Sequence, residues 1–149
     1  MRRTLLLLAL IGGCDREASS TDGGTAAVAA APAEVPLMQL GAFDYKEKMA
    51  LPADVTAWDG KLVKATGFIN PGRQVRDLTE FALVKDRASC CFGARPQPNH
   101  FVAVTLKPGQ KTNYTPDPVS VVGVLRIGER WDGDWLLGVY WIDAGEVVK

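Results

Sequence analysis

The sequence predicts an all-β domain, a small barrel of five strands preceded by a short helical segment. The prediction rests on two observations. Apolar and polar residues alternate with period two in several short segments, and these segments are separated by clusters of Gly, Pro, Asn and Asp. Between the third and fourth segments, residues 107–118 include Pro108, Gly109 and Pro116, so that no long helix is expected there.

The helical segment is expected within residues 41–57. Pro52 can occupy the first turn of a short helix that runs to Trp58, because the missing N–H of proline has no partner at that position anyway. A turn at Asp59-Gly60 then leads into the barrel. The five predicted strands are residues 61–69, 81–85, 101–106, 119–127 and 135–143.

Two glycines and two turns define how these strands connect. Gly67 and Gly123 lie inside predicted strands, where a glycine indicates a bulge or a sharp coil. Asn70-Pro71-Gly72 ends the first strand, and Asp132-Gly133 predicts a hairpin between the last two. A long curled first strand and a closing hairpin favour a Greek-key barrel of the OB type. A β-sandwich is the competing architecture, but it needs more strands.

The N-terminus has the pattern of an export signal. Arg2 and Arg3 precede an apolar run over residues 5–11, and the small residues Gly12 and Gly13 follow. The apolar run is too short to span a bilayer, which takes about 20 residues. Cys14 directly follows the glycine pair, as in the bacterial lipobox, where the cysteine thiol receives a diacylglyceryl group.

This pattern divides the chain into three parts. Residues 1–13 are predicted to be a lipoprotein signal peptide, residues 14–36 the lipidated Cys14 with a disordered tether, and residues 37–149 the OB-like domain. The tether has no aromatic residue and too little apolar surface to fold. The expected location is the extracytoplasmic side of a bacterial envelope. Asp15 resembles the inner-membrane retention signal of enteric bacteria, and the choice between inner and outer membrane stays open.

The charge balance of the predicted domain argues against a nucleic-acid partner. Residues 37–149 contain 14 Lys and Arg against 13 Asp and Glu, without the basic stripe that neutralises phosphates. Enzymatic activity is not expected either, because His100 is the single histidine and no nucleophile elbow is present. Asp132 and Asp134 are too few for a calcium site and are expected at a solvated hairpin tip.

Two adjacent cysteines lie between the second and third predicted strands. Cys90 and Cys91 are separated by one peptide unit, so a disulfide between them is strained. With His100 they could form an open three-ligand site for zinc or copper, or a reactive thiol site. They could also be small buried apolar residues, or pair with another chain.

Large aromatic residues gather at the last predicted strand: Trp131, Trp135, Tyr140 and Trp141. Both faces of this strand are apolar, so one face must meet the core. The other face can be covered by the N-terminal segment, or it can be an exposed patch that docks a partner or ligand.

Several motifs occur in an order that resembles the bacterial family named domain of unknown function 3299. They cover roughly residues 51–143 and comprise Pro52, Gly60-Lys61-x-Val63, Gly67-Phe68, Cys90-Cys91-Phe92-Gly93 and Pro96-x-Pro98-Asn99. The resemblance implies an exported protein with an OB-like topology, and for some members an association with transport systems of the ABC class. It implies no activity, but it marks Cys90, Cys91, Phe92, Gly93, Pro96 and Pro98 as residues that matter together.

The sequence therefore predicts a membrane-anchored bacterial lipoprotein without enzymatic activity. It is expected to act as a binding or accessory module, with a component of an ABC-type transporter as its possible partner. The alternative is a protein that handles thiols or a zinc or copper ion through Cys90, Cys91 and His100.

Overall fold

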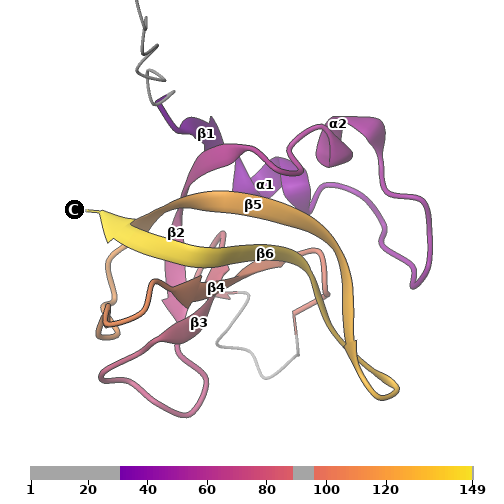
Figure 1. The fold of residues 1–149 in the computed structure, drawn as a ribbon. Helices are drawn as coiled ribbons and strands as arrows, with labels where there is room; N and C mark the ends of the chain where they lie inside the picture. Colours follow the sequence, from indigo (N-terminus) through magenta and orange to yellow (C-terminus); the bar gives the residue numbers. More distant parts are fainter. Residues whose placement is uncertain (1–30, 89–95, 149) are drawn as a thin grey trace, which may run out of the picture.

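The computed structural model describes residues 31–88 and 96–148 of the chain. Nearly half of these residues belong to the strands of one mixed sheet, and the two helices are short (Figure 1), so the all-β prediction is confirmed. Within the described ranges, no helix is long and apolar enough to cross a membrane. The elements are β1 Ala33–Val35, α1 Leu37–Leu40, α2 Ala53–Thr56, β2 Leu62–Asn70, β3 Glu80–Val84, β4 Phe101–Leu106, β5 Val119–Asp132 and β6 Trp135–Val148.

The sheet closes on itself. Its order is β1-β2-β3-β4-β6-β5, and β5 also pairs with β2, so that five strands form a ring with β1 beside it. Neighbours in the ring are antiparallel except β4 and β6, which are parallel. The fourth strand of the ring thus lies beside the first, as in a Greek key. The barrel-like architecture is confirmed, while the finer OB-type assignment stays a prediction that this order agrees with.

Gly67 marks the point where β2 changes partners. Residues Leu62 to Gly67 pair with β5, whereas the residues from Phe68 onward pair with β3. A Cβ atom on Gly67 would stand 2.6 Å from the carbonyl oxygen of Val84 and 2.7 Å from the Leu37 side chain. The predicted curl therefore depends on a close approach that only glycine permits.

The second internal glycine coincides with an irregular pairing. The register of β5 against β6 shifts between Val122 and Val124, at Gly123, as the sequence predicts for a bulge. The core inside the ring is made of aliphatic side chains with Phe81 and Tyr140. The Tyr140 hydroxyl donates a hydrogen bond of 2.7 Å to the main-chain carbonyl of Leu40, which fixes α1 on the end of the barrel.

The folded part begins earlier than the sequence predicts. Residues 33–35, placed in the tether, form β1, which pairs in parallel with Val63 to Ala65 of β2. Val35 is only 4% exposed and joins the core. The tether prediction is therefore wrong at its C-terminal end, because composition cannot detect a three-residue edge strand whose stability comes from its neighbour.

The closing hairpin is also longer than predicted. β5 and β6 have 14 residues each, whereas the sequence predicted ends at residues 127 and 143. Their joined ends extend from the barrel as a two-stranded ribbon, at the lower right of Figure 1. The predicted turn is confirmed: Asp132 pairs with Trp135, and Gly133 adopts a φ of 57°. The predicted short helix is confirmed as α2, with Pro52 as its N-cap.

Candidate functional site

An elongated hollow lies on the outward face of β3, β4 and β6, and it is called the outer trough below. Its floor is a row across three strands, in which Ala82 pairs with Ala103 and Ala103 pairs with Trp141. The two alanines leave a hollow of about 460 Å³ between larger neighbours. These neighbours include Asn70, Pro71, Glu80, Thr105, Arg130 and Trp141.

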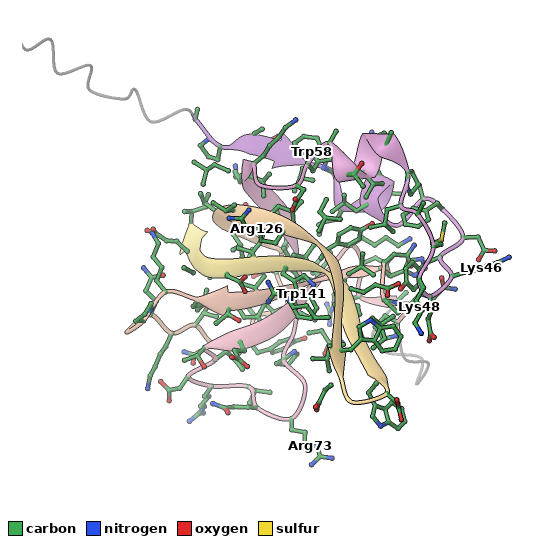
Figure 2. All side chains as sticks on the ribbon, turned by 45° about the vertical axis from the view of Figure 1, so that its right-hand side comes forward. Lys46, Lys48, Trp58, Arg73, Arg126 and Trp141 are labelled. Atoms are coloured by element: carbon green, nitrogen blue, oxygen red, sulfur yellow. The ribbon has the colours of Figure 1, made fainter. Side chains whose placement is uncertain are left out.

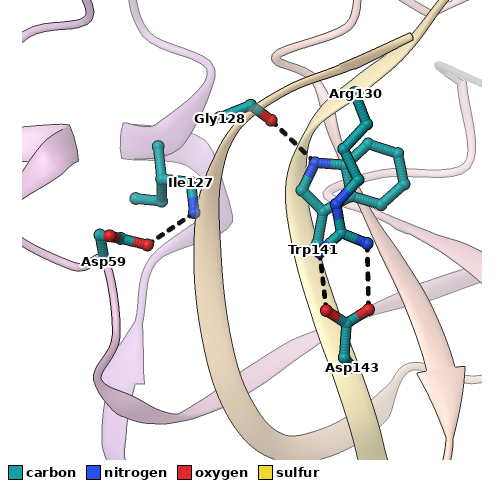
Figure 3. Close-up of polar contacts among 6 residues, drawn as sticks. All are labelled: Asp59, Ile127, Gly128, Arg130, Trp141 and Asp143. Carbon is teal, nitrogen blue, oxygen red and sulfur yellow. Dashed lines mark hydrogen bonds and ion pairs between the residues drawn. The ribbon is translucent and has the colours of Figure 1, made fainter.

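One wall of the outer trough is a stack of aromatic and charged groups (Figure 3). The Trp141 indole N–H donates to the carbonyl of Gly128 at 2.9 Å. The Arg130 guanidinium lies 4.3 Å from the centre of the Trp141 ring and donates two hydrogen bonds, of 3.1 and 2.7 Å, to the Asp143 carboxylate. These bonds raise the pKa of Arg130 and lower the pKa of Asp143. In this wall, the guanidinium of Arg130 and the carboxylate of Asp143 are paired with each other.

The same region of β5 is tied to the turn that follows α2. The Asp59 carboxylate accepts a hydrogen bond of 2.8 Å from the main-chain N–H of Ile127 (Figure 3). The backbone groups of Gly60 and Leu125 are bonded as well, at 2.8 Å. The predicted Asp59-Gly60 turn therefore connects the helical segment to β5 just before the ribbon leaves the barrel.

The ribbon carries the most exposed aromatic residue of the predicted patch. Trp135 is 68% exposed and Leu137 is 44% exposed. Beside them lies a second hollow of about 440 Å³, lined also by Pro96, Pro98 and Phe101. Phe101 precedes Ala103 by two positions and shares its face of β4, so the second hollow adjoins the outer trough. Apolar groups thus line the surface from the ribbon to the barrel.

A cluster of hydrogen bonds around Glu129 holds the β5 strand of the ribbon against the loop between α1 and α2. Glu129 accepts hydrogen bonds from the Tyr45 hydroxyl at 2.5 Å, the Lys48 main-chain N–H at 2.6 Å and the Trp131 indole at 3.1 Å. Lys48 also places its ammonium 5.7 Å from the centre of the Trp131 ring. Figure 2 shows Lys48 on the loop between α1 and α2, whereas the side chain of Lys46 on the same loop points away from the barrel. Trp131 is therefore engaged within the chain.

These contacts fix the protonation of the two groups at the centre of the cluster. The hydrogen bond from Tyr45 is the largest cause that holds the pKa of Glu129 below its ordinary value of 4.5. Burial is the largest cause that raises the pKa of Tyr45, and the bond to Glu129 adds to it. Glu129 is an acceptor of all three bonds only as a carboxylate.

We predict that Glu129→Gln lowers stability in a pH-dependent way. Because the pKa of Glu129 is lower in the folded than in the unfolded chain, its contribution is complete above pH of about 4.5 and is lost as pH falls through the folded pKa. The free energies of unfolding of parent and variant, measured with urea, should differ at pH 7, and the difference should shrink as the pH is lowered below about 4.5. The exposed Glu80→Gln is the control. A difference that stays the same as the pH is lowered would contradict this role of the carboxylate.

The structure does not bring the four predicted aromatic residues onto one surface. Trp135 is on the outward side of the ribbon, Trp141 lines the outer trough, and Trp131 contacts the loop at Lys48. Tyr140 is fully buried in the core. Its inclusion in a partner surface is wrong, because Tyr140 and Trp141 are consecutive in a strand and must point to opposite sides.

The predicted thiol or metal site falls largely outside the described residues. Cys90 and Cys91 lie there, as does the predicted lipidation site Cys14. His100 is partly exposed just before β4, and its ring packs against Gly41. Within residues 31–88 and 96–148, no three His, Cys, Asp or Glu side chains are grouped so that they could hold a metal ion.

Two polar residues that position this surface were not predicted. Nothing in the sequence marks Glu129. Two of its hydrogen-bond donors, Tyr45 and Lys48, are far away in the chain, and the third is Trp131, two residues later. Asn99 was visible only as the last residue of the Pro-x-Pro-Asn motif. It is 1% exposed, and its amide donates 2.9 Å to the carbonyl of Phe43, so it holds the segment after α1 against the start of β4. Its side-chain oxygen has no hydrogen-bond partner within residues 31–88 and 96–148.

The fold and the surface together define a class: small closed β-barrels with an outward trough and a projecting aromatic ribbon. The profile of a family described as protein of unknown function (DUF3299) matches residues 21–148. The chain belongs to this family, and the resemblance predicted from the sequence motifs is confirmed. The match includes β1 and all strands of the ring.

The comparison with solved structures agrees with this assignment. The chain is similar to the crystal structure of a DUF3299 family protein from Pseudomonas aeruginosa PAO1, with a TM-score of 0.57 and 24% sequence identity. The similarity covers 79% of this chain and 95% of that chain. At this identity it shows the shared fold alone. No curated protein matches the sequence.

Proposed function

We propose that this protein is a lipid-anchored, non-enzymatic binding module on the extracytoplasmic side of a bacterial membrane. The observation that supports the binding role is the exposure of Trp135 and Leu137, at 68% and 44%, on a ribbon that projects from a rigid barrel. Exposed apolar side chains beside a hollow are typical of protein interaction sites, and tryptophan is enriched among the residues that dominate their affinity.

The charged groups around the outer trough support binding rather than catalysis. Arg130 and Asp143 are joined by two hydrogen bonds, and Glu129 accepts three. A general acid or base must exchange a proton with its substrate. Here the partners of each group hold it in one protonation state, so these groups position the ribbon and the trough.

The partner we propose is a segment of another protein, and specifically of a component of an ABC-type transport system. The apolar lining from Trp135 and Leu137 to Phe101 and Ala103 suits apolar side chains. The nearly equal numbers of basic and acidic residues in the domain, 14 and 13, do not favour nucleic acid. The transport system enters from the family resemblance described above.

The anchor is tested by Cys14→Ala. Cys14 is the residue placed for acylation, so the variant should leave the membrane fraction or accumulate as an unprocessed precursor. Fractionation of cells, with detection of the fatty acid by metabolic labelling, measures this. Cys90→Ala serves as the control and should keep the lipid. A Cys14→Ala protein that is processed and membrane-bound like the parent would remove the basis of the lipoprotein proposal.

The binding surface is tested by the double variant Trp135→Ser, Leu137→Ser. Crosslinking in native membranes, followed by purification of the full chain, should recover the partner at least tenfold less well with the double variant, since a buried aromatic anchor contributes about 2 kcal/mol or more. Met38→Ser is the matched control, because Met38 is 70% exposed on α1, away from the ribbon. Equal recovery with all three proteins would refute the assignment of this surface.

A further inference from the structure

A separate cavity of about 260 Å³ lies where β2 parts from β5. It has only Asn70 and Pro71 in common with the outer trough. Its walls come from the end of β2, from the two connections at residues 71–79 and 107–118, and from Arg87 in the segment that follows β3. The side chains that matter for its chemistry are Phe68, Pro71, Val75, Arg87, Tyr114 and Pro116.

The walls of this cavity are preformed. The Tyr114 N–H donates to the carbonyl of Val75 at 2.9 Å, and Leu78 and Thr112 exchange two backbone bonds of 2.7 and 3.0 Å. The Asp77 N–H donates to the side-chain oxygen of Asn113 at 3.0 Å. These bonds join the two connections to each other, so a ligand would not have to order them on binding.

The polar lining is positive. Among the described residues, Arg87 is the one charged residue that lines the cavity, and it makes no ion pair with any of them. The Tyr114 hydroxyl likewise makes no hydrogen bond to the described part of the chain, and Tyr114 is 40% exposed. A guanidinium recognises a carboxylate through two parallel hydrogen bonds.

We infer that this cavity is a binding site for a small amphipathic carboxylate, that is, a molecule with one ring or branched apolar group and one carboxylate. The apolar group occupies the space between Phe68, Val75 and Pro116, and the carboxylate pairs with Arg87. The cavity volume of about 260 Å³ is slightly below the roughly 300–1,000 Å³ of sites for drug-sized ligands, so a smaller molecule fits it. Mostly apolar walls with a few convergent polar groups are the usual composition of such sites. This site is independent of the partner surface proposed above.

The experiment compares two probes of nearly the same size and shape, 3-phenylpropionate and its neutral amide, of which only the first carries a charge. Each is titrated into the full chain labelled with nitrogen-15. The expected result is saturable shifts confined to residues 68–75, 87 and 112–116, with the carboxylate bound at least tenfold more tightly than the amide. Arg87→Gln should abolish this difference. Val75→Trp should fill the cavity and remove the binding of both probes.

Arg73→Gln is the matched control. Arg73 lies on the connection at residues 71–79, which also contributes to the cavity, but its side chain points away from the barrel (Figure 2) and does not line the cavity. The inference is overturned by the absence of saturable binding at millimolar probe, by equal affinity for the two probes, or by equal effects of the two arginine substitutions. Shifts centred on Trp135 and Leu137 also overturn it, because the probe then reports the ribbon. The exposed position of Arg87 leaves the fold of Arg87→Gln intact.

Discussion

Replacing Gly67 with alanine is expected to destabilise the protein by about 2–4 kcal/mol, through overpacking at a site that cannot relax. The added methyl group would stand 2.6 Å from the carbonyl oxygen of Val84, 2.7 Å from Leu37 and 3.1 Å from Leu83. The carbonyl belongs to a strand that is hydrogen-bonded on both sides, so it cannot move without loss of the β2–β3 pairing. Equilibrium unfolding in urea, followed by tryptophan fluorescence, measures the effect.

Gly109→Ala separates this steric cost from the general cost of replacing glycine. Gly109 adopts a φ of 83°, and nothing lies within 4 Å of an added Cβ. Its substitution should therefore cost only about 1 kcal/mol, from the left-handed backbone conformation. If Gly67→Ala costs no more than Gly109→Ala, the tight junction between β2, β3 and α1 is not the reason for glycine at position 67.

The strands of the ring could be predicted because each has a local signal. Alternation identifies the segments, Asn70-Pro71-Gly72 ends the first of them, and Asp132-Gly133 fits a two-residue hairpin. Gly67 and Gly123 even locate the irregular positions, since a glycine in a strand is costly unless the backbone needs it. These features depend on residues close together in the chain.

The missed features depend on residues far apart in the chain. β1 is stable only because it pairs with the open edge of β2, and the composition of its three residues does not predict this pairing. The hydrogen bonds of Glu129 join it to Tyr45 and Lys48, across 84 and 81 positions. The C-terminal ends of β5 and β6 were missed because Gly128 and Gly145 interrupt the strand pattern, while the pairing between β5 and β6 carries both strands through.

The same distinction applies to the candidate site. Counting aromatic residues in one segment drew attention to the region of Trp135 and Trp141, and both border hollows. It did not separate Tyr140 from Trp141, which strand alternation places on opposite faces, and it could not reveal the hydrogen bond from Tyr140 to the carbonyl of Leu40, 100 positions earlier. Nor could it find the cavity at Arg87, which exists because two long connections are bonded together. Local pattern therefore pointed to the surface that we propose for a partner, whereas tertiary pairing created the cavity.

Tyr140→Phe is expected to lower stability by about 1–3 kcal/mol, because it leaves the buried carbonyl of Leu40 without its donor. The hydroxyl bond is 2.7 Å long and lies in the core, and burial raises the pKa of Tyr140. Tyr140→Ala also removes the ring and should cost about 3–5 kcal/mol in total. Urea unfolding of both variants gives the two values, and their difference isolates the packing of the ring.

Trp135→Ser and Tyr140→Phe are expected to have opposite effects on stability and on partner recovery. Trp135 is 68% exposed, so its substitution should change stability by less than about 0.5 kcal/mol while partner recovery falls. Tyr140→Phe should lower stability and leave partner recovery unchanged, since the hydroxyl has no access to solvent. Stability and recovery are measured on the same two proteins. A Tyr140→Phe protein that is as stable as the parent but loses its partner would return Tyr140 to the partner surface and contradict the core position assigned to it.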